Sequence, residues 1–270
     1  MKLGQAGSEQ RRVSARRLSS WGLFVGGLAA LVVVILLLRL AIATDFMYHA
    51  LVKDPERTAP EGRVIVAPAD GTVLYVRRVE SGVIPYVVKR GVPVPIVDHL
   101  KLEPARPFDR GYLIGIYMNT QGVHVNRMPD HGTLRQQVIF NGPHMDMSRA
   151  ESRIILTQMI PGLVSLRKLL GLPPHDIADA ADFVLKSARE TLVIEDDRGA
   201  HLYVVRIADF YVGKILTWIG AGQRVERGQR IGMITWGSQT DLLIEETPGL
   251  RVVVDPGEYV YGGQTVVAEY

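Results

Sequence analysis

The sequence contains no cysteine among its 270 residues, which excludes disulfide bonds, thiolate catalysis and cysteine-bound zinc. It also has little net charge outside its N-terminal tail. The whole chain carries a formal charge of +3, whereas residues 1–20 carry +4, so the remaining 250 residues carry 3 − 4 = −1. Because a nucleic-acid-binding domain normally has its basic residues on the folded part, we do not expect nucleic acid as a partner.

One long apolar run is present at residues 21–43, where Arg39 is the one charged residue. A helix needs about 20 apolar residues to span the hydrocarbon core of a bilayer. We therefore expect a membrane anchor, preceded by a basic, cytoplasmic-type tail at residues 1–20. A cleaved signal peptide is the alternative, because Ala-Ile-Ala at residues 41–43 is typical of a cleavage site. The cell membrane is the expected location, and the membrane face stays open.

A polar connector at residues 44–63 and a mainly β domain at residues 64–270 are expected to follow the anchor. Short runs of β-branched and aromatic residues bounded by turn residues predict strands, and they occur at residues 63–79, 112–118, 191–195, 201–208 and 250–254. Residues 222–234 recur in weaker form at 257–269, with the pattern Gly-x-x-Val-x-x-Gly-Gln. Such duplicated hairpins predict a compact β-sandwich or barrel.

A helical insertion is expected between the strands, at about residues 147–190. Apolar residues there follow helical spacing at Ile177, Ala181, Val184 and Ala188. Residues 162–171 are also amphipathic and fit either a helix packed on the sheet or one lying on lipid. The predicted fold class is therefore mainly β (α+β), with a helical insertion and an N-terminal transmembrane helix.

Four short motifs carry the functional signal, in the order 53–57 (KDPER), 66–73 (VAPADGTV), 122–132 (GVHVNRMPDHG) and 228–241 (GQRIGMITWGSQTD). Behind a membrane segment, this order resembles the phosphatidylserine decarboxylase family, especially its shorter bacterial and archaeal branch. The resemblance covers most of residues 51–157 and 200–270. It implies a self-processing, pyruvoyl-dependent lyase of phospholipid biosynthesis, which converts phosphatidylserine to phosphatidylethanolamine and carbon dioxide.

The Gly237-Ser238 pair is where the resemblance places self-cleavage. Gly237 has no Cβ to hinder attack on its carbonyl, and the Ser238 hydroxyl can convert the amide into an ester. Elimination and loss of ammonia then leave covalent pyruvate, the pyruvoyl group, at the new chain end. Its carbonyl accepts the substrate amine and withdraws electrons as carbon dioxide leaves, so no other cofactor and no metal is expected. The products, residues 1–237 and 238–270, are expected to stay associated.

Activating a serine requires a base and a group that orients the base. The resemblance assigns Asp70 to the charge-relay set, although an Asp-Gly turn is an alternative role. His124 is the expected proton-transfer group. Arg127 is expected to bind the phosphate or carboxylate of the substrate, with a plain salt bridge as the alternative. His131 and His144 are expected to be structural.

Three positions depart from the family pattern. Gly122 stands where an aspartate is usual, two places before His124. Thr235 and Gln239 stand where the shorter branch often has arginine. One acid and two cations are therefore missing, which predicts a changed substrate preference rather than a loss of self-processing.

Two other interpretations stay open. The duplicated segments also occur in lipoyl-like barrel-sandwich modules, so the chain could be a membrane-anchored adaptor without enzymatic activity. Such adaptors usually contain a long coiled coil, and the 147–190 block is short and interrupted by prolines. A pyruvoyl decarboxylase acting on another amine is the second alternative. A homo-oligomer is compatible with either.

Overall fold

The computed structural model describes residues 24–43, 52–85, 94–119, 122–143, 166, 169–171, 186–208, 214–235 and 238–270. The chain divides into two compact units, Met1–His49 and Ala50–Tyr270, which we describe separately. In the first unit, Phe24–Ala43 forms a 20-residue helix with a mean hydropathy of 2.7, and all of its side chains are exposed. Twenty helical residues span about 30 Å, so this helix is long and apolar enough to cross a membrane, by length and composition.

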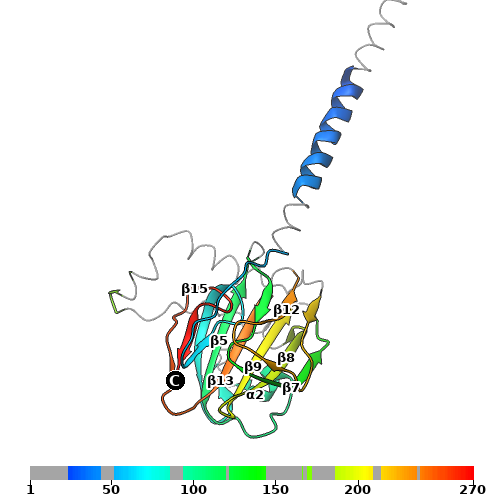
Figure 1. The fold of residues 1–270 in the computed structure, drawn as a ribbon. Coiled ribbons are helices and arrows are strands. Elements are labelled where there is room, and N and C mark those ends of the chain that lie inside the picture. Colours follow the sequence, from blue (N-terminus) through cyan, green and yellow to red (C-terminus); the bar gives the residue numbers. More distant parts are fainter. Residues whose placement is uncertain are drawn as a thin grey trace, which may run out of the picture. The chain divides into compact units, whose positions relative to one another are not determined.

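The second unit is mainly β, as predicted, and its strands are paired antiparallel (Figure 1). Its largest sheet has eight strands in the order β11 (Arg224–Val225), β7 (Gly132–Phe140), β8 (Arg189–Asp196), β9 (His201–Ala208), β13 (Ser238–Glu245), β5 (Gly111–Met118), β2 (Gly71–Val79) and β15 (Tyr259–Val260). Two three-stranded sheets have the orders β1 (Val64–Val66), β16 (Val266–Glu269), β14 (Arg251–Val252) and β10 (Ile215–Thr217), β12 (Arg230–Ile234), β6 (Val125–Arg127). A two-stranded sheet of β3 (Val83–Ile84) and β4 (Val94–Pro95) precedes the short helix α2 (Ile96–Leu100).

The centre of the eight-stranded sheet is buried on both faces, since nearly every residue of β5, β8 and β9 is buried, whereas β7 has exposed positions. In β13, Leu242 and Ile244 belong to one core cluster and Leu243 belongs to the other, as the alternation of side chains along a strand requires. The first cluster also contains side chains of β1, β12 and β16, so the three-stranded sheets cover that face. The second contains side chains of β3, β4 and α2. We call the face that these elements cover the α2 face.

The duplicated segments reverse direction as predicted, but they are not self-paired hairpins. In residues 222–234, β11 pairs with β7 at one edge of the large sheet, whereas β12 pairs with β10 and β6. In residues 257–269, β15 pairs with β2 at the opposite edge, whereas β16 pairs with β1 and β14. The glycines at the turns, Gly228 and Gly263, have positive φ angles of 77° and 76°, which allows the reversal without fixing the partner strands. Each copy therefore places one strand in the large sheet and one in a small sheet.

Most of the predicted helical insertion at 147–190 lies outside the described residues. Its C-terminal boundary is corrected, because β8 begins at Arg189. Arg189 and Glu190 pair with Ile207 and Arg206 of β9. The long apolar run of β9 offers these two residues strand partners, and this tertiary pairing outweighs their helical spacing.

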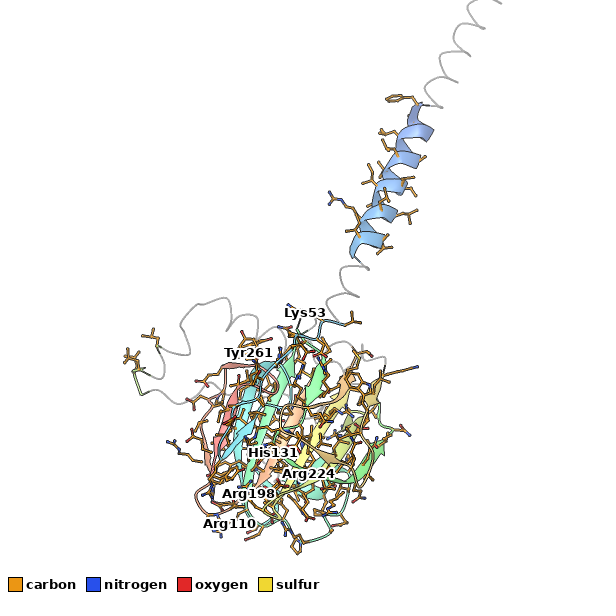
Figure 2. All side chains as sticks on the ribbon, in the orientation of Figure 1. Lys53, Arg110, His131, Arg198, Arg224 and Tyr261 are labelled. Carbon is orange, nitrogen blue, oxygen red and sulfur yellow. The ribbon has the colours of Figure 1, made fainter. Side chains whose placement is uncertain are left out.

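The strand register defines two ends of the large sheet. Ser238 and Gly71 begin their strands at one end, which we call the Ser238 end. Val260 pairs with Gly71, so the next residue, Tyr261, also lies at this end. Figure 2 shows Tyr261 and Arg110 at opposite ends of the β unit.

Candidate active site

Ser238 is the first residue of β13, an inner strand of the eight-stranded sheet. Its backbone lies between Met118 of β5 and Ala208 of β9. Strand β12 ends at Ile234 in a three-stranded sheet, so the chain passes from one sheet to the other within residues 235–237. Gly237 lies outside the described residues. A break just before Ser238 would separate two strands of different sheets and interrupt neither.

His124 is completely buried and lies close to the end of β12 and to the residue that follows the strand partner of Ser238. Its Nδ1 is 2.9 Å from the carbonyl oxygen of Ile234, and its Nε2 is 3.0 Å from the carbonyl oxygen of Asn119. Ile234 ends β12, four residues before Ser238, and Asn119 follows Met118, the partner of Ser238 in the sheet. The fold therefore brings the imidazole to the Ser238 end.

Both ring nitrogens of His124 face hydrogen-bond acceptors. A neutral imidazole carries one N–H, whereas an imidazolium carries two. The neutral ring therefore satisfies one carbonyl oxygen as a donor, and a ring that has gained a proton satisfies both.

Asp70 is buried and tightly bound at the start of β2. Arg57 donates hydrogen bonds to both carboxylate oxygens, with a distance of 2.8 Å from Nη2 to Oδ2. The backbone N–H of Gly262 donates to Oδ1 at 2.7 Å. The hydrogen bonds to Asp70 raise the pKa of Arg57, against an opposing effect of burial. The pair therefore remains a closed ion pair at neutral pH.

The register places Asp70 at the Ser238 end, although not beside Ser238. Thr72 pairs with Tyr117 of β5, and Tyr117 pairs with Gln239 of β13. Asp70 is therefore two strand spacings from the start of β13, about 10 Å at the level of the backbone. An effect of its carboxylate on Ser238 requires an intermediate group.

Arg127 is buried and fastens the predicted connector to the β unit. One Nη donates to Asp54 at 2.6 Å and to the carbonyl oxygen of Pro55 at 3.0 Å, and the other donates to the carbonyl oxygen of Gly228 at 3.0 Å. Asp54 also binds Arg230. Arg127 therefore forms a salt bridge, the alternative role that its sequence allowed, with a guanidinium that is buried and a carboxylate partner that is partly exposed.

Two of the three departures from the family pattern lie on loops. A Cβ at Gly122 would be 2.9 Å from Oδ1 of Asn119 and 3.6 Å from the hydroxyl of Tyr259. Burial raises the pKa of Tyr259, and Asp70 raises it further, so the phenol beside Gly122 is neutral at physiological pH. The Thr235 hydroxyl bonds to the backbone of Lys214 in both directions, at 2.8 and 3.1 Å.

The third departure, Gln239, is completely buried on the α2 face. Its Nε2 donates to the Tyr75 hydroxyl at 2.7 Å and to Asp241 Oδ1 at 2.6 Å. The Tyr75 hydroxyl donates to Asp241 Oδ2 at 2.7 Å. His99 of α2 brings Nε2 within 3.1 Å of the same oxygen. We call these four residues the Gln239 cluster.

Burial lowers the pKa of His99, although Asp241 opposes the shift. The unfolded chain therefore binds more protons than the folded chain just below the ordinary pKa of about 6.5, so the free energy of unfolding is highest above that pH and falls as the pH drops. In His99→Gln we expect the free energy of unfolding to fall less steeply between pH 6.5 and pH 5. The slope should decrease by up to about 1.4 kcal/mol per pH unit, the contribution of one proton. Urea denaturation at each pH measures it. The control is His131→Gln, and a slope unchanged in His99→Gln contradicts the expectation.

Two further histidines, His131 and His144, are predicted from the sequence to be structural. His131 contacts the carboxylate of Glu226 at the surface, and His144 lies outside the described residues. Three residues of the site, Arg57, Tyr75 and Asp241, are assigned no role by the sequence motifs. The charged run at residues 53–57 was a signal for the first of these. The other two meet across residues far apart in the chain, and no local pattern marks them.

A family model described as phosphatidylserine decarboxylase matches residues 43–268. A phosphatidylserine decarboxylase proenzyme from Symbiobacterium thermophilum is 28% identical over 250 residues, which cover 90% of this chain and 91% of that protein. A protein from Methanocaldococcus jannaschii, named as an archaetidylserine decarboxylase proenzyme, is 33% identical over 80% of this chain and 86% of its own length. A phosphatidylserine decarboxylase proenzyme from Nitratidesulfovibrio vulgaris is 30% identical, with 80% and 74% covered.

Proposed function

The chain belongs to the phosphatidylserine decarboxylase family, and we propose that it is activated by cutting its own backbone between Gly237 and Ser238. Family membership makes it a phosphatidylserine decarboxylase-like carboxy-lyase, related to proteins that are named as proenzymes. The proposal rests on His124, whose ring contacts the carbonyl oxygen at the end of β12 and that of Asn119, which follows the strand partner of Ser238.

In the proposed cut, the hydroxyl oxygen of Ser238 attacks the carbonyl carbon of Gly237, and the amide becomes an ester. Elimination across the Cα–Cβ bond of residue 238 then releases the carboxylate of Gly237. Addition of water and loss of ammonia leave the pyruvoyl carbonyl at the new chain end. The placement of this bond at a crossing between two sheets supports the proposal, because the strands on both sides keep their partners.

His124 is the proposed group that takes the proton of the Ser238 hydroxyl. Ring nitrogen Nδ1 or Nε2 would leave its carbonyl contact to receive this proton, and the other nitrogen would stay bonded to the carbonyl oxygen of Asn119 or Ile234. Asp70 is proposed to be a positioning residue, since it lies about 10 Å away across two strand spacings. Held by Arg57 and Gly262, it fixes the start of β2 at the Ser238 end.

A pyruvoyl group at residue 238 fits this structure, because the strand that begins there is hydrogen-bonded on both sides from Ser238 to Ile244. When formed, the group supplies a carbonyl that accepts the substrate amine and withdraws electrons while carbon dioxide leaves. The two products, residues 1–237 and 238–270, stay associated in this proposal, since β13 lies between β5 and β9 of the larger product.

A substrate-binding role for Arg127 remains a prediction. Its two Nη groups donate to Asp54, Pro55 and Gly228, so an anionic headgroup would have to replace one of these acceptors. A guanidinium could then form a bidentate contact with a phosphate or carboxylate.

Membrane association is proposed from the apolar helix together with a lipid substrate. In this scheme residues 1–20 form the basic tail, residues 21–43 the anchor, residues 44–63 the connector and residues 64–270 the catalytic β domain. A helix that holds the enzyme at the bilayer keeps it next to a substrate that does not leave the membrane.

The mass of the purified chain under denaturing conditions tests the cut. We expect two fragments divided before Ser238, the smaller with 270 − 237 = 33 residues and a pyruvoyl end. The cleaved protein is then given vesicles of phosphatidylserine, vesicles of archaetidylserine, or free serine, and carbon dioxide release is measured. Turnover of either lipid supports a phosphoserine headgroup as substrate. An intact chain would support the interpretation as an adaptor without enzymatic activity. Turnover of free serine alone would support a pyruvoyl decarboxylase that acts on another amine.

Replacing His124 by alanine is expected to slow the cut by about 100-fold or more, because general-base catalysis contributes about 10² to 10⁴. The half-time of cleavage is measured by mass after expression at low temperature. The control is His131→Ala, at the surface histidine beside Glu226, which should cut at the wild-type rate. Normal cleavage and turnover in His124→Ala would assign proton transfer to another group.

A further inference from the structure

We infer that the Gln239 cluster is a lock that positions the chain end created at residue 238. The inference rests on the proposed cut and adds positioning residues that the proposed chemistry does not use. Gln239 follows the cut directly, so after cleavage it is the first side chain behind the reactive end. It makes both of its described hydrogen bonds within the cluster, to Tyr75 and Asp241.

The cluster connects β2 with β13 across the strand that lies between them, β5. Tyr75 of β2 and Asp241 of β13 both pair with Gly115 of β5, which stands between them. A Cβ at Gly115 would lie 2.4 Å from Cζ of the Tyr75 ring. The absence of a side chain there lets the ring lie across β5, so the phenol reaches Asp241 on the far strand. A glycine is therefore needed at residue 115 because the Tyr75 ring lies so close to its backbone, and not because the chain turns there.

The cluster is also fixed from the outside of the sheet. His99 comes from α2, and its carbonyl oxygen accepts a hydrogen bond from the buried Arg189 of β8 at 2.8 Å. Asp241 therefore has the Tyr75 hydroxyl, the Gln239 amide and the His99 ring around its two oxygens. These hydrogen bonds favour one arrangement of the strand that carries them, although Oε1 of Gln239 is buried without a hydrogen-bond partner among the described residues.

Cutting changes which contacts hold residue 238. Before the cut, residue 238 is held by the peptide bond to Gly237 as well as by β13. After the cut it is held by β13 alone, and its distance from His124 depends on how well that strand end is fixed. A displacement of about 1 Å at a reacting group can cost about 100-fold in rate. The lock should therefore matter more for turnover than for the cut itself.

The test uses the full-length protein and the variants Tyr75→Phe and Gln239→Met, which remove hydrogen bonds while keeping side-chain size. We expect the cleavage half-time to stay within about twofold of wild type. We expect kcat per cleaved molecule to fall by about tenfold or more with KM little changed, the pattern of lost transition-state positioning. The melting temperature is recorded for each variant.

The matched control is Tyr112→Phe, which removes a phenol hydroxyl on β5 that accepts a hydrogen bond from Arg78 Nη1 at 2.7 Å. Tyr112 pairs with Ile244, at the end of β13 far from Ser238, so its kcat should equal that of wild type. A kcat in Tyr75→Phe and Gln239→Met equal to that of Tyr112→Phe overturns the inference. So does a parallel fall of cleavage, kcat and melting temperature, which marks a purely structural role. Failure of the wild type to cut overturns the proposed function instead, and the two failures are distinguishable.

Discussion

Ser238→Ala is expected to remain a single chain of 270 residues and to lose decarboxylation completely. The substitution removes one oxygen at the first residue of β13 and leaves every backbone pairing of the strand in place. Because the hydroxyl oxygen starts the cut, and the pyruvoyl carbonyl forms only after the cut, the loss of this oxygen should abolish both. Removal of a catalytic nucleophile typically costs about a millionfold. Denaturing mass measurement and carbon dioxide release from phosphatidylserine vesicles are the readouts.

A hydroxyl can be restored at the same position with Ser238→Thr, the matched control. Threonine keeps the nucleophile and adds a methyl group that hinders it, so we expect slow cutting rather than none. Ser187→Ala, at a buried serine outside β13, should cut at the wild-type rate. Two fragments in Ser238→Ala, or turnover by its intact chain, would contradict the proposed chemistry.

The largest expected effect on stability comes from Glu190→Gln. Glu190 of β8 and Arg206 of β9 are both buried and form an ion pair. Glu190 also accepts hydrogen bonds from Thr217 and Gln137, each at 2.6 Å. Burial lowers the pKa of Arg206 to about 9, so the guanidinium is still charged at neutral pH and needs its partner. Removing one charge of a buried pair costs about 3 to 5 kcal/mol.

The decrease in the free energy of unfolding is best measured by urea denaturation at pH 7.5. The Ser238→Ala background is used, where one uncut chain is expected to give a single transition. The double variant Glu190→Leu/Arg206→Met is the control. Replacing both charges by apolar side chains is often neutral or stabilising, so it should recover most of the loss. The exposed pair of Arg224 and Asp197 provides the comparison, since Asp197→Asn should change the free energy of unfolding by less than about 1 kcal/mol. A similarly small effect of Glu190→Gln would contradict the buried-pair account.

The fold class, the family and the apolar helix were predictable from the sequence because their signals are local. The strand pair at residues 191–208 is an example, since two apolar runs flank an Asp-Asp-Arg-Gly turn and β8 and β9 do pair across it. The repeated glycines likewise predicted two reversals of direction. The partners of the reversed strands were not predictable, because a turn fixes direction and not the sheet in which each strand ends.

In the candidate site, too, the residues in local motifs were predictable, and the contacts made by tertiary packing were not. Ser238, His124 and Asp70 lie in motifs, and the structure places all three at the Ser238 end. Arg57 lies in a motif as well, but its ion pair with Asp70 could not be predicted, because it depends on how the connector packs on the β domain. Tyr75 and Asp241 are 166 positions apart, and their meeting depends on a missing side chain at Gly115. Such contacts follow from tertiary packing rather than from any local pattern.

The strand order has a kinetic consequence. Residues 238–270 supply an inner strand and an edge strand of the large sheet, together with β14 and β16 of a small one. After the proposed cut this 33-residue fragment (270 − 237) could escape only by breaking the core on both faces. Its dissociation rate would then equal the global unfolding rate of the domain, which for small domains can be as slow as days. The lifetime of the active enzyme would accordingly be set by an unfolding barrier and not by a binding affinity.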